Sequence, residues 1–336
     1  MSAVTVHQAD NAPRFQAGTE HVESWFFRAN HPTEPRAIWL KATILSRRGG
    51  AVAEAWCSLF DGDRDRALGR KVTVPMASAR IGGSSLGIHV EGCSFQLGAD
   101  RGSAKGTLGE FSWDLSWERL PGPLGEPLCM LPSRRLVDAR LPRNKLLTPS
   151  PVLLCSGTAR WGGQTWSMER WPGMQGHNWG RAHSPEYAWG QCVFSSELGE
   201  PVCTVEAASG RVALGGRTSP LLALMSIRRG GRVYRFDRLL DLWNRDARID
   251  FPEWTLRMKG PAGEALLSMR ARPERMVCLG YENPSGQLSH CLNSKLAAVS
   301  LRVNPVNEEA FECRSLHGGA LEFLQREPVS AIPEVV

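Results

Sequence analysis

The stretch Val152–Trp171, VLLCSGTARWGGQTWSMERW, holds two short runs of β-forming residues on either side of Gly162-Gly163. Glycine accepts the positive φ angles that tight hairpin turns require. The stretch therefore predicts two antiparallel strands joined by a hairpin turn. Similar runs recur along the chain, and few segments keep a helical period over three turns. The predicted strands are Glu23–Ala29, Ala37–Leu45, Ala51–Phe60, Ser112–Glu118, Val152–Arg160, Gln164–Trp171, Tyr187–Phe194, Val202–Ala207, Arg232–Leu239, Trp254–Met258 and Lys295–Val303.

The turns between these runs are rich in glycine. Arg48-Gly49-Gly50, Asp61-Gly62 and Gly230-Gly231 each separate two runs, and the chain has 34 glycines. Many short strands with such turns are typical of a β-sandwich or a β-barrel. We therefore expect an all-β protein.

A proline-rich segment divides the chain near its middle. Proline cannot donate to a sheet ladder, so we expect an irregular connection at 119–151 with one edge strand at Leu136–Leu141. The strands of Val152–Trp171 could close the first half or open the second, and we assign them to the first. The predicted domains are residues 15–170 and 171–326. The prolines are Pro121, Pro123, Pro127, Pro132, Pro142, Pro149 and Pro151.

Composition bounds the class of protein. Of the 336 residues, 42% are hydrophobic and 22% are charged, so the chain can bury a core. No stretch approaches the roughly 20 apolar residues that span a bilayer. The segment Met1–Glu20 lacks the apolar core of a signal peptide. We expect a soluble, cytoplasmic protein, with peripheral membrane contact left open and the oligomeric state unknown.

Cysteines and arginines suggest neither a zinc site nor a nucleic-acid site. The nine cysteines are scattered without a CxxC pair, so we interpret them as buried thiols. The net charge is +6, but the arginines between 228 and 248 alternate with apolar residues and accompany aspartates. That pattern is typical of the solvated face of antiparallel strands, and we expect no nucleic-acid partner. These arginines are Arg228, Arg229, Arg232, Arg235, Arg238, Arg245 and Arg248.

The candidate site is a concentration of tryptophans around Gly176-His177-Asn178-Trp179-Gly180. Five of the twelve tryptophans lie within 29 residues, and aromatic residues with a few polar groups typically line a ligand site. Alternation along a strand would place His177 and Trp179 on one face and Asn178 on the other. Tyr187 and Trp189 would likewise share a face. The five are Trp161, Trp166, Trp171, Trp179 and Trp189.

Three side chains could carry proton chemistry. His177 is either a general acid or base or a hydrogen-bonded structural histidine. Glu206 shares a strand face with Thr204. Buried among aromatics, its carboxyl would have a raised pKa and could act as an acid, whereas on the surface it would be ordinary. Glu23 is either an inward-facing polar residue or an exposed one.

Other constellations are absent from the sequence. There is no nucleophile elbow, P-loop, dinucleotide fingerprint, HExxH or EF-hand loop, so we expect no cofactor. His177, His183 and Glu186 lie on one short segment without a further ligand elsewhere, so we predict no metal. A faint echo links Glu23-Ser24-Trp25 with His177-Asn178-Trp179, since each precedes an arginine, an alanine, a histidine and a proline. It suggests an internal duplication.

The motif Gly176-His177-Asn178-Trp179-Gly180 resembles the signature of the tocopherol cyclases, the carotenoid 1,2-hydratases (hydroxyneurosporene synthases) and the AttH-like proteins. It is also similar to the lipocalin-like pericyclases that fold polyketide chains. Near the N-terminus, Glu23-Ser24-Trp25-Phe26-Phe27-Arg28 resembles the Glu-Gly-Trp-Tyr-Phe-Lys stretch of tocopherol cyclases. The two matches are about 150 residues apart and in the family's order, so the resemblance covers most of the chain.

The resemblance implies two tandem lipocalin-like antiparallel β-barrels with a ligand cavity near their interface. It implies cofactor-free chemistry on a polyene, a prenylated quinol or a polyketide. His177 and Trp179 are the matching positions. Hydratases also place a tyrosine and an aspartate two residues apart on a following strand, and Thr204 and Glu206 are the counterparts here. Glu206 keeps an acidic side chain at the aspartate position, but Thr204 replaces the tyrosine. Cyclisation, isomerisation, hydration and plain binding therefore all stay open.

The sequence thus predicts a cyclase, isomerase or hydratase for a lipophilic small molecule. The alternative is a lipophile carrier with the same cavity and no chemistry. We predict His177 and Glu206 as catalytic residues. The predicted substrate-binding residues are Trp179, Asn178, Tyr187, Trp189, Thr204, Glu23 and Trp25.

Overall fold

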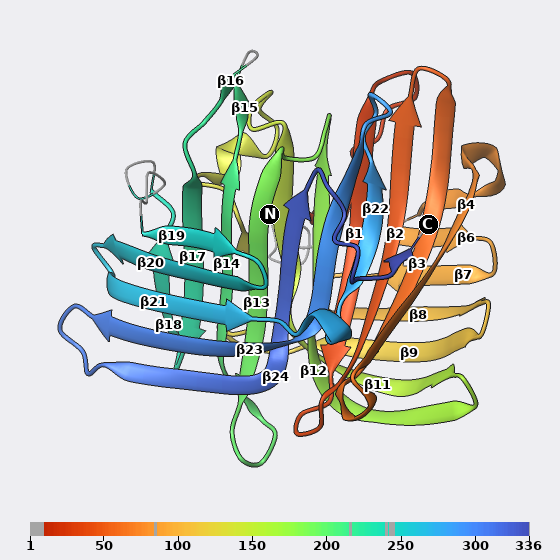
Figure 1. Cartoon of the computed structure of the whole chain (residues 1–336). Helices are drawn as coiled ribbons and strands as arrows, with labels where there is room; N and C mark the ends of the chain where they lie inside the picture. The colour runs from red at the N-terminus through yellow and green to blue at the C-terminus, as the bar shows by residue number, and fades with distance from the viewer. Residues whose placement is uncertain (1–9, 84–85, 215–216, 239–240, 242–245, 336) are drawn as a thin grey trace.

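The computed structural model describes residues 10–83, 86–214, 217–238, 241 and 246–335, and two strongly curved sheets lie side by side in it (Figure 1). The short segments Gly62–Arg64, Met76–Ser78, Arg134–Leu136 and Pro273–Arg275 are 3-10 turns. The predicted all-β fold of two tandem lipocalin-like barrels is confirmed, each barrel being one curled sheet. Neighbouring strands are antiparallel apart from the short parallel pair β22–β25.

The first sheet has its N-terminal strand in the middle. Its order is β4 (Arg66–Pro75), β3 (Gly50–Asp61), β2 (Arg36–Arg47), β1 (His21–Asn30), β12 (Gln164–Gly180), β11 (Asn144–Trp161), β9 (Phe111–Arg119), β8 (Arg101–Leu108), β7 (Cys93–Leu97), β6 (Leu86–Val90) and β5 (Arg80–Gly82), with β10 (Leu128–Cys129) also on β11.

The second sheet repeats this plan. Its order is β18 (Arg232–Phe236), β17 (Leu222–Arg229), β14 (Pro201–Arg211), β13 (Glu186–Ser195), β24 (Phe311–Gln325), β23 (Leu288–Pro305), β21 (Gly263–Arg270), β20 (Glu253–Gly260) and β19 (Ala247–Asp250). Here β22 (Val277–Glu282) pairs with β23 and with β25 (Glu334–Val335), as β10 pairs with β11 in the first sheet. A separate ribbon joins β15 (Ala213–Leu214) to β16 (Arg217–Thr218).

The matching order supports an internal duplication, with β1 corresponding to β13 and β12 to β24. The similarity between Glu23-Ser24-Trp25 and His177-Asn178-Trp179 does not follow this correspondence, because the two segments lie on neighbouring strands of the first sheet. Trp25 lies opposite His177, and Glu23 lies opposite Trp179. The expected domain boundary between residues 170 and 171 falls inside β12. Strand pairing changes from the first sheet to the second only after Gly180.

The hairpin that predicts the fold is present. Trp161 pairs with Gln164, and Gly162 and Gly163 have φ angles of +53° and +80°, as a two-residue turn requires. The edge strand expected at Leu136–Leu141 is wrong, since those residues form the end of a 3-10 turn and an irregular segment. Instead, β11 runs through Pro149 and Pro151, where its register with β12 shifts and the missing N–H groups are tolerated.

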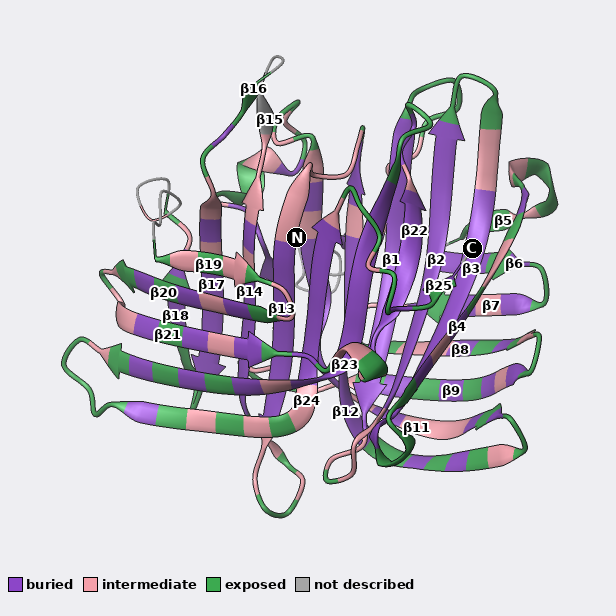
Figure 2. Cartoon of the chain, in the orientation of Figure 1, coloured by how far each residue is buried: buried purple, intermediate pink, exposed green. Residues whose placement is uncertain are grey.

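Burial follows from the packing of the two sheets (Figure 2). All ten residues of β1 are buried, because one face covers the first core and the other packs at the junction of the sheets. Outer strands such as β9 instead alternate between buried and exposed residues. Three large cores result, one inside each barrel and one at the junction, and a smaller cluster lies under the proline-rich connection.

Candidate functional site

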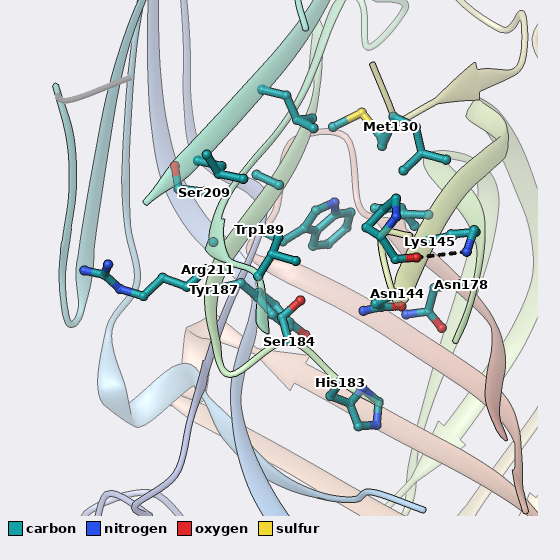
Figure 3. Close-up of a pocket in the computed structure, with 18 of the residues that line it drawn as sticks. Met130, Asn144, Lys145, Asn178, His183, Ser184, Tyr187, Trp189, Ser209 and Arg211 are labelled. Atoms are coloured by element: carbon teal, nitrogen blue, oxygen red, sulfur yellow. Dashed lines mark hydrogen bonds between the residues drawn. The ribbon is translucent and has the colours of Figure 1, made fainter. Parts of the chain in front are cut away.

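A cavity of about 470 Å³ lies at the junction of the two sheets, lined by residues of β1, β2, β11 and β12 on one side and β13, β14 and β17 on the other. We call it the junction cavity. The proline-rich connection covers one end with Met130, Leu131, Pro132, Leu136, Leu141 and Pro142. In Figure 3, Asn144, Lys145 and Asn178 lie on one side of the cavity, opposite Tyr187 and Ser209. A mostly apolar lining with few polar groups is usual for a small-molecule site.

Three of the predicted binding residues line the junction cavity: Asn178, Tyr187 and Trp189. Tyr187 and Trp189 share the junction face of β13 as expected, since Ala188 between them packs into the second core. The Trp189 ring meets the Phe26 ring edge to face, with ring centroids 5.9 Å apart. An aromatic wall thus crosses from one sheet to the other.

Glu206 is buried next to this aromatic wall and contacts Trp189. Trp189 pairs with Ala208 across β13 and β14, and Glu206 is on the same face two residues along β14, opposite Gln191. One carboxylate oxygen accepts a hydrogen bond from Trp189 Nε1 at 3.2 Å, and Thr148 Oγ1 lies 2.9 Å from both oxygens. Burial raises the pKa of Glu206 to about 7, although these two hydrogen bonds oppose the rise. The residue is 2% exposed and does not itself line the cavity.

Thr204 belongs to the packing below Glu206. Its hydroxyl donates to the Cys192 carbonyl at 3.0 Å and accepts from Gln191 Nε2 at 3.2 Å. Gln191 also accepts from Arg28, a buried residue of β1 that reaches across the junction. Gln191 therefore ties the two sheets together, and Thr204 supports its side chain at a distance from the cavity.

His177 and Glu23 form a buried pair on the other face of the first sheet. His177 Nε2 lies 2.8 Å from Glu23 Oε1, and His177 Nδ1 lies 2.6 Å from the Asp10 carbonyl oxygen. Glu23 also accepts from the Arg14 backbone N–H at 2.8 Å, and His21 Nε2 lies 3.0 Å from its second oxygen. Burial raises the pKa of Glu23, but the hydrogen bonds to His177 and His21 outweigh it and hold the pKa at about 2.

Tryptophans enclose this pair. The Trp25 ring stacks on His177 with centroids 4.9 Å apart, and the Trp179 ring lies 4.8 Å away at a tilt. Trp25 Nε1 donates to the Asn11 carbonyl. The expected alternation is confirmed, because His177 and Trp179 share one face of β12 while Asn178 faces the junction cavity.

The predicted site residues therefore fall into two groups. Asn178, Tyr187 and Trp189 line the junction cavity, with Glu206 and Thr204 beneath it. His177, Glu23, Trp25 and Trp179 are packed on the opposite face. Neighbouring residues of β11 mark the division, since Leu147 packs with Trp179 and Thr148 holds Glu206. His177 and Glu206 thus face different surroundings.

Sequence reasoning missed several polar residues of the cavity wall, among them Lys41, Tyr281 and Glu322, and considered His183 only as a possible metal ligand. The His183 ring stacks on Tyr281 with centroids 5.2 Å apart, and Lys41 Nζ lies 3.7 Å from the Tyr281 ring centroid. Burial and the nearby Lys41 charge lower the pKa of His183 to about 3. Lys41, Tyr281 and Glu322 come from three separate segments of the chain, so local pattern gives no signal for them. The scarcity of tyrosine, with three in 336 residues, is the one hint.

Two arginines hold the proline-rich cover in place. Arg228 is 5% exposed, and its guanidinium donates to the carbonyls of Glu126 and Pro127. The interpretation of this arginine as part of a solvated face is wrong, because it points from β17 into the junction. Arg235 donates to the Cys129 carbonyl. Leu239 and Arg245, named in the sequence predictions, lie outside the described residues.

The remaining sequence candidates have ordinary surroundings. All nine cysteines are free thiols, and all but Cys313 are buried, as predicted. His183 stacks on Tyr281, whereas Glu186 pairs with Arg211 at 3.0 Å. Across the described residues, no group of three or more His, Cys, Asp or Glu side chains is placed to hold a metal ion. No helix in the part of the chain that the structure describes is long and apolar enough to cross a membrane.

Comparison with known proteins gives a family and a fold. The model of the tocopherol cyclase-like family matches residues 152–322. Two uncharacterised proteins of Mycobacterium tuberculosis, from strains H37Rv and CDC 1551, are 23% identical over 295 residues, which is 87% of this chain and 84% of theirs.

Two crystal structures share the fold. An AttH-like protein from Nitrosomonas europaea aligns with a TM-score of 0.56 and 12% identity over 91% of this chain and 93% of its own. Kievitone hydratase from Nectria haematococca aligns with a TM-score of 0.57 and 9% identity over 90% of this chain and 88% of its own.

Proposed function

The chain belongs to the tocopherol cyclase-like family, and on that premise we propose that it is a cofactor-independent cyclase, isomerase or hydratase for a lipophilic substrate held in the junction cavity. The substrate class is a terpenoid-like, prenylated or polyketide molecule. The similarity in fold to kievitone hydratase is consistent with hydration as one member of this set.

One observation supports acid-assisted chemistry above all others: a buried carboxyl with a pKa of about 7 lies under the aromatic wall. At neutral pH about half of the Glu206 population is protonated, which is the state that a general acid needs. The carboxyl is linked to the cavity through its hydrogen bond with Trp189.

In the proposed reaction Glu206 gives its proton to the substrate, at an alkene carbon or a carbonyl oxygen. The positive charge that develops lies against the rings of Phe26 and Trp189, and such ring faces stabilise cations. Water or an internal hydroxyl of the substrate then captures the cation, and the resulting oxonium ion returns its proton to the Glu206 carboxylate. Asn178 and Tyr187 orient the polar end of the substrate. If the reaction needs no proton, the shape of the junction cavity alone would direct it.

We assign His177 a structural role in this proposal. Both of its ring nitrogens are engaged, with Glu23 and with the Asp10 carbonyl, and its ring is fully buried. The family motif would then contain the histidine of the buried His177–Glu23 pair, which holds the N-terminal segment against β12. Glu23, Trp25 and Trp179 share this role.

Turnover of candidate substrates tests the proposal. Wild-type protein, Glu206→Gln and Trp189→Ala are incubated with a linear polyene, a prenylated quinol and a polyphenolic polyketide, and the products are separated by chromatography with mass detection. We expect a new isomer or hydrate from at least one substrate, slowed about 10²–10⁴-fold by Glu206→Gln. Full turnover by Glu206→Gln would remove the acid assignment.

The second candidate function is a lipophile carrier. The observation that favours it is the depth of Glu206, which is 2% exposed and lies beneath Trp189. A substrate would have to displace the indole to reach the carboxyl. If every ligand that binds is returned unchanged after long incubation, the carrier function is the correct one.

A further inference from the structure

The wall of the junction cavity contains a buried ammonium group. Resting on the proposed function, we infer that Lys41 and Trp39 form a binding site for the anionic oxygen head group of an amphipathic lipophile. Both residues project from the junction face of β2, two positions apart, and both line the cavity. The apolar part of the ligand would extend along the cavity past Trp189.

Lys41 has no anionic partner within the described part of the chain. It is 4% exposed, and its Nζ lies 3.7 Å from the Tyr281 ring centroid and 5.7 Å from the Trp56 ring centroid. Among the residues that the structure describes, none places a carboxylate within ion-pair distance of this Nζ. Desolvation of an unpaired cation is costly, so an anion that entered the cavity would be attracted strongly.

The nearby carboxylates are committed elsewhere. Glu322 lies 2.7 Å from Lys295 Nζ and accepts from Asn293 at 2.9 Å. Glu54 lies 3.7 Å from Lys71 and accepts from Trp56 Nε1 at 3.2 Å. Neither carboxylate therefore forms an ion pair with Lys41, and its positive charge is not neutralised by them.

Trp39 supplies an independent observation. Its indole N–H is buried, and across the described residues it has no hydrogen-bond acceptor. A buried donor without an acceptor is costly, and of the unpaired indole N–H groups in the described residues only that of Trp39 belongs to a residue of the junction cavity. An anionic oxygen bound beside Lys41 is an acceptor of the kind that this donor lacks.

The other polar groups of the wall are compatible with an anion. Burial and the neighbouring Cys291 and Glu322 raise the pKa of Tyr187, and burial also raises the pKa of Tyr281, so both phenols stay protonated. Burial lowers the pKa of Lys41 to about 8, which still leaves it mainly charged at pH 7. A bound anion would raise that pKa again.

Binding of a fluorescent polyene fatty acid, cis-parinaric acid, tests the inference against its primary alcohol, which has the same tail. We expect the wild-type protein to bind the acid at least 10-fold more tightly than the alcohol at pH 7. Lys41→Met should remove that preference and leave the affinity for the alcohol within 3-fold, while Lys41→Arg should keep most of it. Thermal unfolding checks that each variant folds.

Lys145→Met is the matched control. Lys145 lines the same cavity, but its Nζ already donates to the Pro142 carbonyl at 2.9 Å, so the preference for the acid should change less than 3-fold. Equal binding of acid and alcohol by the wild type, or a preference that survives in Lys41→Met, overturns the head-group site and leaves the proposed function standing. If neither probe binds the wild type, the apolar cavity function fails as well.

Discussion

Two glutamates with almost the same burial behave in opposite ways. Glu23 is 0% exposed and has a pKa of about 2, whereas Glu206 is 2% exposed and has a pKa of about 7. Desolvation raises both values. The difference lies in the partners, since Glu23 meets two histidines and a backbone N–H, while Glu206 meets a hydroxyl and an indole N–H.

The comparison separates two uses of a buried carboxyl. A carboxylate with charge-assisted hydrogen bonds stays ionised and fastens one part of the chain to another. A carboxyl held by neutral donors keeps its proton near neutral pH and is available for proton transfer. Burial alone distinguishes neither use, so the functional assignment depends on what surrounds each side chain.

The largest effect should come from removing Glu23. Glu23→Ala leaves His177, His21 and the Arg14 N–H without their acceptor, and breaking a buried pair in this way costs about 3–5 kcal/mol of unfolding free energy. Urea unfolding measures the loss. The matched control, Glu206→Ala, removes the same atoms from a site with a hydroxyl and an indole N–H as hydrogen-bond partners and should cost less. A smaller loss in Glu23→Ala than in Glu206→Ala would contradict the comparison.

Acid should weaken the same pair in the intact protein. The folded pKa of Glu23 is lowered from 4.5 to about 2, so its stabilisation is complete above pH 4.5 and disappears as the pH falls toward 2. The shift corresponds to roughly 3 kcal/mol. Unfolding free energies measured between pH 2 and 6 should show this loss in the wild type and not in Glu23→Gln. Parallel curves for the two proteins would show that Glu23 is not the group responsible.

Much of the fold was predictable because strand alternation and glycine turns are local signals. The hairpin at Gly162-Gly163, most strand positions and the alternation at His177-Asn178-Trp179 follow from two-residue periodicity. The last residue of the first sheet could not be predicted from this periodicity. It is set by the pairing of β12 with β1, about 150 residues earlier in the chain, which continues to Gly180. The prediction of an edge strand at Leu136–Leu141 was wrong because those residues cover the cavity and do not pair with another strand.

The Glu206 carboxyl should produce a pH effect of the opposite sign. Its folded pKa is raised from 4.5 to about 7, so the folded state holds the proton more tightly and stability declines as the pH rises from 4.5 to 7. Glu206→Gln removes that penalty and should gain about 1–3 kcal/mol at pH 8 relative to its effect at pH 4. Melting temperatures at the two pH values measure the difference. An equal effect at both would mean that Glu206 titrates normally.

The site was predictable only in part. Residues near the motif on the same strands, such as Asn178, Tyr187 and Trp189, line the cavity as local alternation suggests. Lys41, Tyr281 and Glu322 reach it from β2, β22 and β24, and only the packing of the two sheets brings them together. The role of Glu23 was equally hidden, because its histidine partner is 154 residues away.

The smallest effect should come from the indole that links Glu206 to the cavity. Trp189→Phe keeps an aromatic ring and deletes the N–H that donates to the carboxylate at 3.2 Å. Since that bond favours the ionised form, its loss should raise the pKa of Glu206 above about 7 by less than one unit, or about 1 kcal/mol. Carbon-13 NMR of the side-chain carboxyl, assigned with Glu206→Gln, follows the titration. An unchanged or lower pKa would mean that Trp189 shapes the cavity without tuning the acid, and the partners of Glu23 would then account for the difference between the two glutamates.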